Sequence, residues 1–275
     1  PVALPDDWGR ADASISIHFA QSLPGELSIR RVSQNDGRLY LQIRSSKGPI
    51  QGDAEIKQGD KSIGHATCDD SLWLSIKPRI GKIALQIFSG DVKEHVQLMS
   101  PTTLVEIRGS QIFVNGEHFL IKGATGSGLH PEDAPAVHAL GINLLRGQKA
   151  LDDCERYGFM SIASLNYGGI ASLDALKAPD SEFERTVTQC LEWLNHNDTA
   201  AIESPNTLIV QLGNERSSGG APPGRESDSL QRRHVAQLIA RARNQIKPLA
   251  PMLPVGYANQ DLSFLTPDCM DVYMH

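Results

Sequence analysis

Hydrophobic and polar residues follow two different patterns along the chain, and the change falls near residue 107. Before it, short segments alternate apolar and polar residues, and turn-forming residues separate them. These segments are ASISIHF (13–19), ELSIRRV (26–32), RLYLQIRSS (38–46), SLWLSIK (71–77) and KIALQIFSG (82–90). Alternation with a period of two is typical of strands that bury one face, and short strands at this spacing predict an antiparallel β-sandwich.

After the change, apolar segments are followed by patterns typical of amphipathic helices. The dipeptide Asn115-Gly116, a strong hairpin-turn signal, stands near the start of this region. The strand candidates cover residues 119–124, 142–146, 159–165, 206–213, 252–258 and 270–275, and helices are expected near 132–140, 149–157, 182–197 and 228–247. Strands that are apolar on both faces and alternate with helices predict parallel βα units.

The number of strand candidates limits the architecture of this second region. A (β/α)8-type barrel needs eight strands, whereas a doubly wound sheet could stop at the six found here. No GxGxxG motif opens an expected helix, so a dinucleotide-binding fold has no support. The expected fold class is therefore all-β plus α/β, with one domain over residues 1–106 and a second over residues 107–275.

Composition and charge exclude several kinds of partner. The net charge of −6 leaves no basic footprint for nucleic acid. No stretch approaches the roughly 18 consecutive apolar residues that suggest a membrane-spanning helix. The four cysteines lie far apart without a CxxC pair, so a zinc site built from clustered cysteines is not expected. We therefore predict no metal, no cofactor, no nucleic-acid partner and no membrane-spanning segment.

Reactive side chains of parallel βα folds gather at the carboxyl ends of the strands. The polar residues at or beyond these ends are His130, Arg146, Asn166, Tyr167, Asn214, Glu215, Tyr257, Asn259 and His275. Glu215 is the strongest candidate for chemistry, because the end of an apolar strand partly desolvates its carboxyl group. Desolvation raises the pKa of a carboxyl group, which can then hold a proton and donate it to a leaving group. A structural cap or an ion pair is the other interpretation of Glu215.

Four short motifs occur together and in a fixed order. They are IFVNGEHFLIKGA (112–124), GINLLR (141–146), ERYGFM (155–160) and GNE (213–215) after LIVQL. This combination resembles the entry into the catalytic domain of glycoside hydrolase family 2, the group of β-galactosidases, β-glucuronidases and β-mannosidases. The resemblance covers roughly residues 105–275.

The resemblance implies both a fold and an activity. The fold would be an immunoglobulin-like β-sandwich over residues 1–106, followed by the first part of a TIM-barrel domain over residues 107–275. The activity would be the retaining hydrolysis of β-glycosidic bonds, with a carbohydrate as partner. The family also favours an extracytoplasmic location, periplasmic or secreted.

Residue by residue, the resemblance assigns three central roles. Glu215 becomes the general acid/base, and Asn214 the residue that holds the sugar 2-hydroxyl. Arg146 takes the place of the arginine on the second barrel strand that supports the nucleophile carboxylate. A structural salt bridge is the alternative interpretation of Arg146.

Four further residues are candidate substrate contacts. His130 matches a histidine of the family, but residues 126–127 depart from the family's pattern, so surface-loop and substrate-contact interpretations both stay open. Asn166 and Tyr167 either line the cleft or belong to a loop turn. His275 stands where the family often places a polar residue that faces the sugar.

A retaining glycosidase needs a second carboxylate about 5–5.5 Å from the first. In the family this nucleophile lies on the seventh barrel strand, whereas this sequence ends within the sixth, and Asp271 is expected at the opposite end of the barrel. Two explanations are open: an excerpt of a longer glycosidase, or a degenerate relative that binds carbohydrate without hydrolysing it. Cellulase-like barrels also end their fourth strand in Asn-Glu, although the upstream β region favours family 2.

Overall fold

The chain forms two compact units. The computed structural model describes residues 1–6, 14–90, 95–125, 130, 132–146, 150–165, 167–214, 229–258, 265–266 and 269–274. Unit 1 comprises Pro1–Phe119 with Leu249–Met252, and unit 2 comprises Leu120–Pro248 with Leu253–His275. The predicted domain boundary between residues 106 and 107 stays a prediction.

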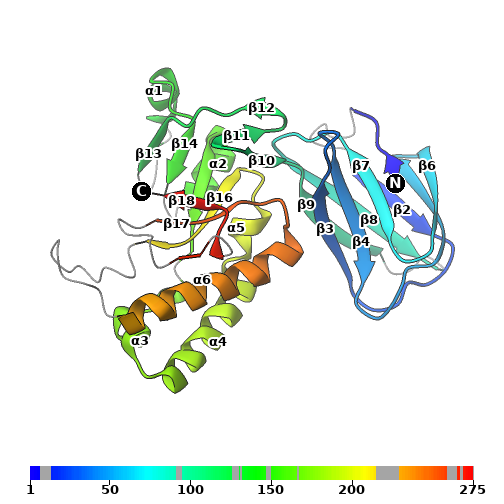
Figure 1. The fold of residues 1–275 in the computed structure, drawn as a ribbon. Coiled ribbons are helices and arrows are strands. Elements are labelled where there is room, and N and C mark those ends of the chain that lie inside the picture. Colours follow the sequence, from blue (N-terminus) through cyan, green and yellow to red (C-terminus); the bar gives the residue numbers. More distant parts are fainter. Residues whose placement is uncertain are drawn as a thin grey trace. The chain divides into compact units, whose positions relative to one another are not determined.

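Unit 1 contains two larger sheets (Figure 1). The first has the order β1 (Val2–Ala3), β7 (Leu72–Ile76), β4 (Leu39–Ser45) and β3 (Leu27–Ser33). The second has the order β6 (Lys61–Cys68), β5 (Gly52–Gln58), β2 (Ile15–Phe19), β8 (Lys82–Ser89) and β9 (His95–Pro101). Most pairs are antiparallel, as predicted, but β1 pairs parallel with β7 and β2 pairs parallel with β8.

Alternate residues of both sheets meet in one hydrophobic core. Ile15 and Ile17 of β2 and Leu41 and Ile43 of β4 are completely buried members of the same cluster. All five segments that the alternating pattern singled out contain strands. The pattern missed β1, β5, β6 and β9, of which β6 and β9 are edge strands that bury few side chains. An edge strand with little buried surface has little need for alternating apolar residues.

A small third sheet completes unit 1. It consists of β10 (Val105–Arg108), β11 (Gln111–Val114) and β12 (Glu117–His118), paired antiparallel. The predicted hairpin turn joins β11 to β12, with φ of 53° at Asn115 and 85° at Gly116. Positive φ at both central positions is what asparagine and glycine allow.

Unit 2 contains a curled parallel sheet whose six strands follow one another in chain order (Figure 1). They are β13 (Gly123–Thr125), β14 (Leu144–Arg146), β15 (Met160–Ser164), β16 (Thr207–Asn214), β17 (Val255–Ala258) and β18 (Val272–Met274). Each strand lies within or overlaps one predicted segment. The first strand, β13, begins four residues later than the predicted segment 119–124. The apolar residues Leu120 and Ile121 lie before it and are 64% and 42% exposed, so they are not part of a buried strand.

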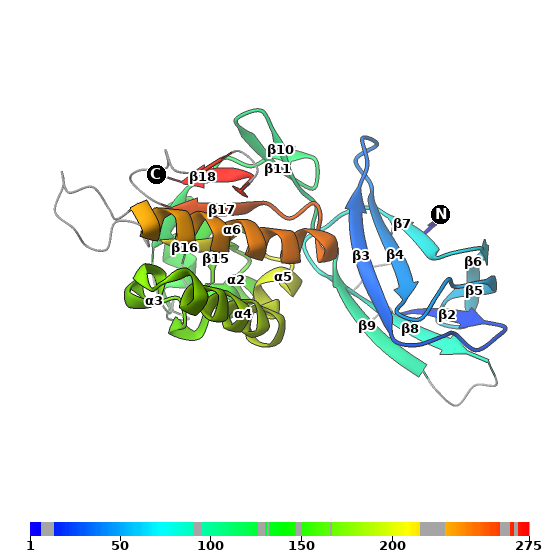
Figure 2. The same ribbon diagram turned by 60° about the horizontal axis from the view of Figure 1, so that its bottom comes forward.

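Helices connect the strands of this sheet. They are α1 (Ala134–Ala139), α2 (Ala150–Tyr157), the 3-10 helix η1 (Tyr167–Gly169), α3 (Leu173–Lys177), α4 (Asp180–Asn197), α5 (Thr199–Glu203) and α6 (Ser229–Leu249). The two long helices α4 and α6 bury the apolar faces that their sequence periodicity predicts, and they lie side by side in Figures 1 and 2. Among the described residues, no helix combines the length and the apolar character that crossing a bilayer requires.

Polar contacts hold α6 against α4. Arg241 forms a two-pronged ion pair with Glu184, with N–O distances of 2.7 and 2.8 Å. His234, fully buried, stacks on Phe183 at 3.8 Å between ring centroids. Its two ring nitrogens lie 3.0 Å from Leu176 O and 3.0 Å from Asp180 Oδ1.

The amino end of the parallel sheet is closed by an ion cluster. Asp271, just before β18, accepts from Arg243 Nη2 at 3.0 Å and from the backbone N–H of Val255 at 2.9 Å, and its other contact is Lys247 Nζ at 2.5 Å. Burial alone would raise the pKa of Asp271, but Lys247, Val255 and Arg243 together outweigh it and hold that pKa below its usual range. This carboxylate therefore joins α6 to the beginnings of β17 and β18.

Candidate functional site

The carboxyl ends of three neighbouring strands bring four polar side chains together. Arg146 is the last residue of β14, Ser164 the last of β15, and Gln211 and Asn214 lie on β16. Ser164 stands directly opposite Gln211 in the register of the two strands. Parallel strands align their ends, so residues distant in sequence meet at one edge of the sheet.

The four side chains form a connected hydrogen-bond network. Arg146 donates from Nε to Gln211 Oε1 at 2.9 Å and from Nη2 to Asn214 Oδ1 at 2.5 Å. Ser164 Oγ donates to the same Gln211 oxygen at 3.3 Å, and Gln211 Nε2 donates to the backbone carbonyl of Gly213 at 2.9 Å. The guanidinium group is thus held by two amide oxygens.

A bulge explains how Gln211 and Asn214 reach the same guanidinium. Side chains three positions apart on a regular strand point to opposite faces of the sheet. Between Gln211 and Asn214 the register shifts relative to β17, and Gly213 has a φ of 149°. This backbone conformation is open essentially to glycine alone. The bulge turns Asn214 to the side on which Gln211 lies.

The network leaves hydrogen-bond donors at the edge of the sheet. Asn214 is exposed and its Oδ1 accepts from Arg146, so its amide nitrogen is the group left for other contacts. Arg146 is half-buried and permanently charged, and its guanidinium carries five N–H groups. Its bonds within the described part of the chain go to neutral oxygens. Such donors suit the hydroxyl or carboxylate oxygens of a ligand.

Two of the predicted site residues lie in this network, and two others lie elsewhere. Arg146 and Asn214 are in direct contact. Tyr167 is buried, with 2% of its surface exposed, and its hydroxyl donates to the backbone carbonyl of Leu212 at 3.1 Å. His130 is exposed, and its carbonyl accepts from the Asp133 N–H at the beginning of α1.

The remaining predicted site residues lie outside the described residues. These are Glu215, Asn166 and His275. Glu215 directly follows β16 in the sequence, next to Asn214. Its assigned role stays a prediction.

Inspection of the strand ends missed two members of the network, Ser164 and Gln211. Gln211 is only 1% exposed and interrupts the apolar run Leu208–Leu212. A polar residue inside an otherwise apolar buried strand needs a hydrogen-bond partner, because burying it without one is unfavourable. That interruption is the signal by which the sequence could have indicated Gln211.

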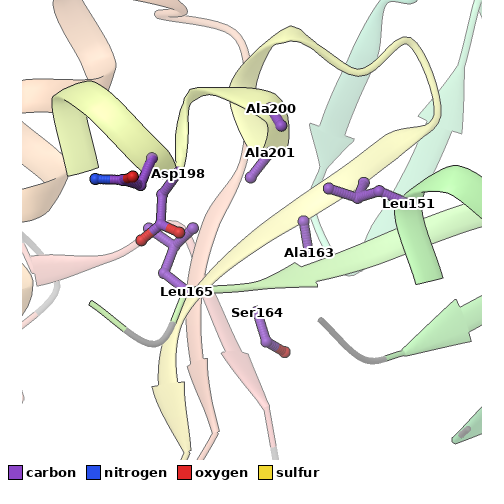
Figure 3. A pocket seen from close by; sticks show the side chains of 8 residues that line it. Leu151, Ala163, Ser164, Leu165, Asp198, Ala200 and Ala201 are labelled. Atoms are coloured by element: carbon purple, nitrogen blue, oxygen red, sulfur yellow. The ribbon is translucent and has the colours of Figure 1, made fainter. Parts of the chain in front are cut away.

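A small pocket lies beside the network, on the side of the sheet covered by helices (Figure 3). Its volume is about 190 Å³, and it is lined by Leu151, Ala163, Ser164, Leu165, Asn197, Asp198, Ala200 and Ala201. Figure 3 shows the Ser164 side chain directed away from Ala163 and Leu165, as alternation along β15 requires. The hydroxyl of Ser164 therefore serves the network, and the pocket walls are mainly apolar.

Asp198 is the charged group of this pocket. Burial raises the pKa of its carboxyl group, and the Trp193 side chain and the Tyr167 backbone N–H oppose that shift only in part. Within the described residues, no hydrogen bond of good geometry reaches its buried Oδ2 atom. Burial therefore makes the charged form of this carboxyl group less favourable than it is in water.

In the described ranges, potential metal ligands do not cluster and the cysteines are buried. No three histidine, cysteine, aspartate or glutamate side chains there gather in a way that could hold a metal ion. All four cysteines are buried, and none of them forms a disulfide bond. Burial raises the pKa of Cys154 to about 12, which keeps that group in the unreactive thiol form.

Comparison with known proteins identifies the class of fold. No protein-family model and no curated protein sequence matches the chain. Solved structures of glycoside hydrolases of family 2 do match it in fold, which confirms the resemblance seen in the motifs at the level of fold.

Three of these structures illustrate the similarity. β-Glucuronidase 3 of Bacteroides uniformis is 14% identical with a TM-score of 0.52, and the match covers 94% of this chain and 34% of that one. β-D-Glucuronidase of Dictyoglomus thermophilum is 14% identical with a TM-score of 0.52, covering 94% and 47%. A family 2 member from Bacteroides cellulosilyticus is 12% identical with a TM-score of 0.51, covering 94% and 39%. The chain thus spans less than half the length of these proteins.

Proposed function

We propose that this chain is part of a retaining β-glycosidase whose sugar site lies at the carboxyl ends of β14, β15 and β16. The observation that carries the proposal is the hydrogen bond from Arg146 to Asn214, two residues 68 positions apart in sequence. A parallel sheet gathers reactive groups at this end, and the fold is shared with family 2 glycosidases. In this proposal unit 1 corresponds to the immunoglobulin-like sandwich, and unit 2 to the first six strands of a (β/α)8-type barrel.

The roles within the site follow from the chemistry of glycoside hydrolysis. Glu215 protonates the glycosidic oxygen and later takes a proton from the attacking water. Asn214 donates its amide N–H to the sugar 2-hydroxyl. Arg146 supports the nucleophile carboxylate, which sequence outside these 275 residues supplies. Its two neutral partners, Gln211 and Asn214, leave its positive charge for such a carboxylate.

Three other residues keep the roles predicted from the sequence, and Tyr167 takes a different one. His130, Asn166 and His275 are proposed contacts to the substrate. Tyr167, whose hydroxyl bonds to the backbone of β16, would act through the strand that carries Asn214. The neighbours named β-glucuronidase make uronic acid glycosides the first substrates to test.

Kinetics of a Glu215→Gln variant test the hydrolase proposal. The protein that contains this chain is assayed with aryl β-glucuronides, β-galactosides and β-mannosides. For a poor leaving group we expect kcat/KM to fall about 10²–10⁴-fold, the usual contribution of a general acid. A dinitrophenyl leaving group needs no protonation, so the first half-reaction should largely recover.

Glu203→Gln is the matched control, because Glu203 is an exposed glutamate at the end of α5. It should leave the rates unchanged. Equal rates for wild type and Glu215→Gln with the poor leaving group would remove Glu215 from the mechanism.

A non-catalytic carbohydrate-binding protein is the second candidate. The observation that favours it is the chemistry of the network, which consists of one guanidinium, two amides and one hydroxyl. These groups can form hydrogen bonds to a sugar, but the network itself contains no carboxylate that could act as acid or nucleophile. If the protein only binds carbohydrate, calorimetry should detect glycan binding without turnover. Arg146→Ala and Asn214→Ala should then abolish that binding.

A further inference from the structure

We propose that Gln211 is the positioning residue of this site, holding Arg146 and the Gly213 bulge in one fixed arrangement. The proposal deepens the function proposed above and rests on it only where ligand binding is concerned. Gln211 touches no ligand in this account. It acts through Arg146 and Asn214.

Gln211 links three strands through one buried amide group. Its oxygen accepts from Arg146 on β14 and from Ser164 on β15, and its nitrogen donates to Gly213 on its own strand. Only 1% of the residue is exposed, so water competes little for these bonds. Removing the amide would leave a guanidinium N–H, a hydroxyl and a carbonyl without this partner.

The orientation of the Gln211 amide is determined by its neighbours. Its oxygen faces two donors and its nitrogen faces a carbonyl. A flipped amide would place N–H groups against the guanidinium and an oxygen against the Gly213 carbonyl. Both contacts would be repulsive, so the glutamine has a single favourable arrangement.

This arrangement sets the direction of Arg146. A guanidinium is planar, so fixing its Nε–H on Gln211 also fixes the direction of both terminal nitrogens. One of them, Nη2, then donates to Asn214 Oδ1, which leaves the Asn214 amide nitrogen available to a ligand. The bond from Gln211 to the Gly213 carbonyl holds the bulge that carries Asn214. One side chain thus controls both partners of the Arg146–Asn214 contact.

Two substitutions separate the two functions of Gln211. Gln211→Met keeps the length and the apolar stem but removes every polar contact. Gln211→Glu keeps oxygens that accept from Arg146 and Ser164, but it replaces the donor to Gly213 with an acceptor. Gln231→Met is the matched control, because Gln231 is a glutamine of similar burial, 2% exposed, that lies on α6 and not on the strands of the network.

The first readout is hydrogen exchange of the arginine Nε–H groups by NMR, with Arg146→Lys identifying the Arg146 signal. In the wild type we expect this proton to exchange at least about tenfold more slowly than in exposed arginines. Gln211→Met should abolish the protection, whereas Gln231→Met should keep it. Gln211→Glu should keep it too, and should shift the backbone amide signals of residues 212–214.

The second readout is the affinity for an aryl β-glucuronide and, where turnover occurs, kcat and KM. A misplaced binding group reduces affinity or rate about tenfold to a hundredfold, so Gln211→Met should show a loss of this size and Gln231→Met should not. Unfolding midpoints in urea show whether each variant is folded. If Gln211→Met fails to fold, the test uses Gln211→Glu and the backbone amide signals of residues 212–214.

The outcomes separate the two proposals. If the wild type binds no glycoside while Arg146 protection still depends on Gln211, the positioning role holds and the glycosidase proposal fails. If glycosides bind and Gln211→Met keeps both the protection and the affinity, the positioning role is wrong. Unchanged 212–214 amide signals in Gln211→Glu would also overturn it, because the bulge would not depend on that donor.

Discussion

Positively charged side chains have different partners at the two ends of the parallel sheet. At the amino end, Arg243 and Lys247 meet the carboxylate of Asp271, which also binds a backbone N–H. At the carboxyl end, Arg146 meets only neutral oxygens within the described residues. A neutralised charge stabilises the fold, whereas an unneutralised one is available to a partner. The comparison indicates that the amino end serves stability, and it fits the binding role proposed above for the carboxyl end.

Breaking the amino-end cluster should have the largest effect. Asp271→Asn leaves Lys247 and Arg243 partly buried without their counter-charge, and we expect the free energy of unfolding to fall by about 2–3 kcal/mol at pH 7. Urea denaturation measures this. If Asp271→Asn lowers the free energy of unfolding but leaves the exchange of the Arg146 Nε–H unchanged, the two ends of the sheet are independent.

The pH dependence sharpens the same test. The folded-state pKa of Asp271 lies below its value in the unfolded chain, about 3.9. Its contribution is therefore fully present above about pH 4 and is lost as the pH falls through the folded pKa. The difference in the free energy of unfolding between wild type and Asp271→Asn should therefore become smaller as the pH falls below about 4. Glu184→Gln, which breaks an exposed ion pair with Arg241, should cause a smaller loss.

Straightening the bulge should have the next largest effect. Gly213→Ala forces a side chain onto a backbone with φ of 149°, and we expect a loss of about 1–3 kcal/mol. The side-chain amide signals of Asn214 should move as well, because the bulge directs that residue. Gly109→Ala, at φ 63° in an exposed turn, also strains the backbone but should leave those signals in place. Equal signals in both variants would contradict the role of the bulge.

The smallest expected effect has the opposite sign. The folded-state pKa of Asp198 is raised, so its charged form destabilises the fold above that pKa and the penalty disappears as the pH falls through it. Asp198→Asn keeps an acceptor oxygen and removes the charge. Stability at pH 7 should rise by less than about 1 kcal/mol, after allowance for solvent screening. A clear loss in thermal denaturation would show that the carboxylate is needed in its charged form.

The sequence predicted those parts of the fold in which local pattern and burial agree. The apolar faces of α4 and α6 repeat with helical spacing because both helices pack on other elements, and the buried strand β16 carries an apolar run. The edge strands β6 and β9 were missed because little of their surface is buried. The parallel pairing of β2 with β8 was also missed, since pairing between distant segments leaves no local signal.

The sequence identified the site residues at the strand ends but not the buried residue Gln211. Arg146 and Asn214 end their strands, so the rule for parallel sheets finds them. Gln211 lies three positions before the end of β16, and its partners come from two other strands. The bulge at Gly213 then decides which side chains meet, and a single glycine in a sequence does not reveal a register shift.

The strand order of unit 2 affects how the protein is built. Each parallel strand pairs with the one before it in the chain, so the sheet can grow from one edge as synthesis proceeds, with each loop closed before the next begins. In unit 1, β2 cannot acquire its parallel neighbour until β8 has been made. Because pairing between segments distant in sequence slows folding, we expect the second sheet of unit 1 to form only after β8 has been made.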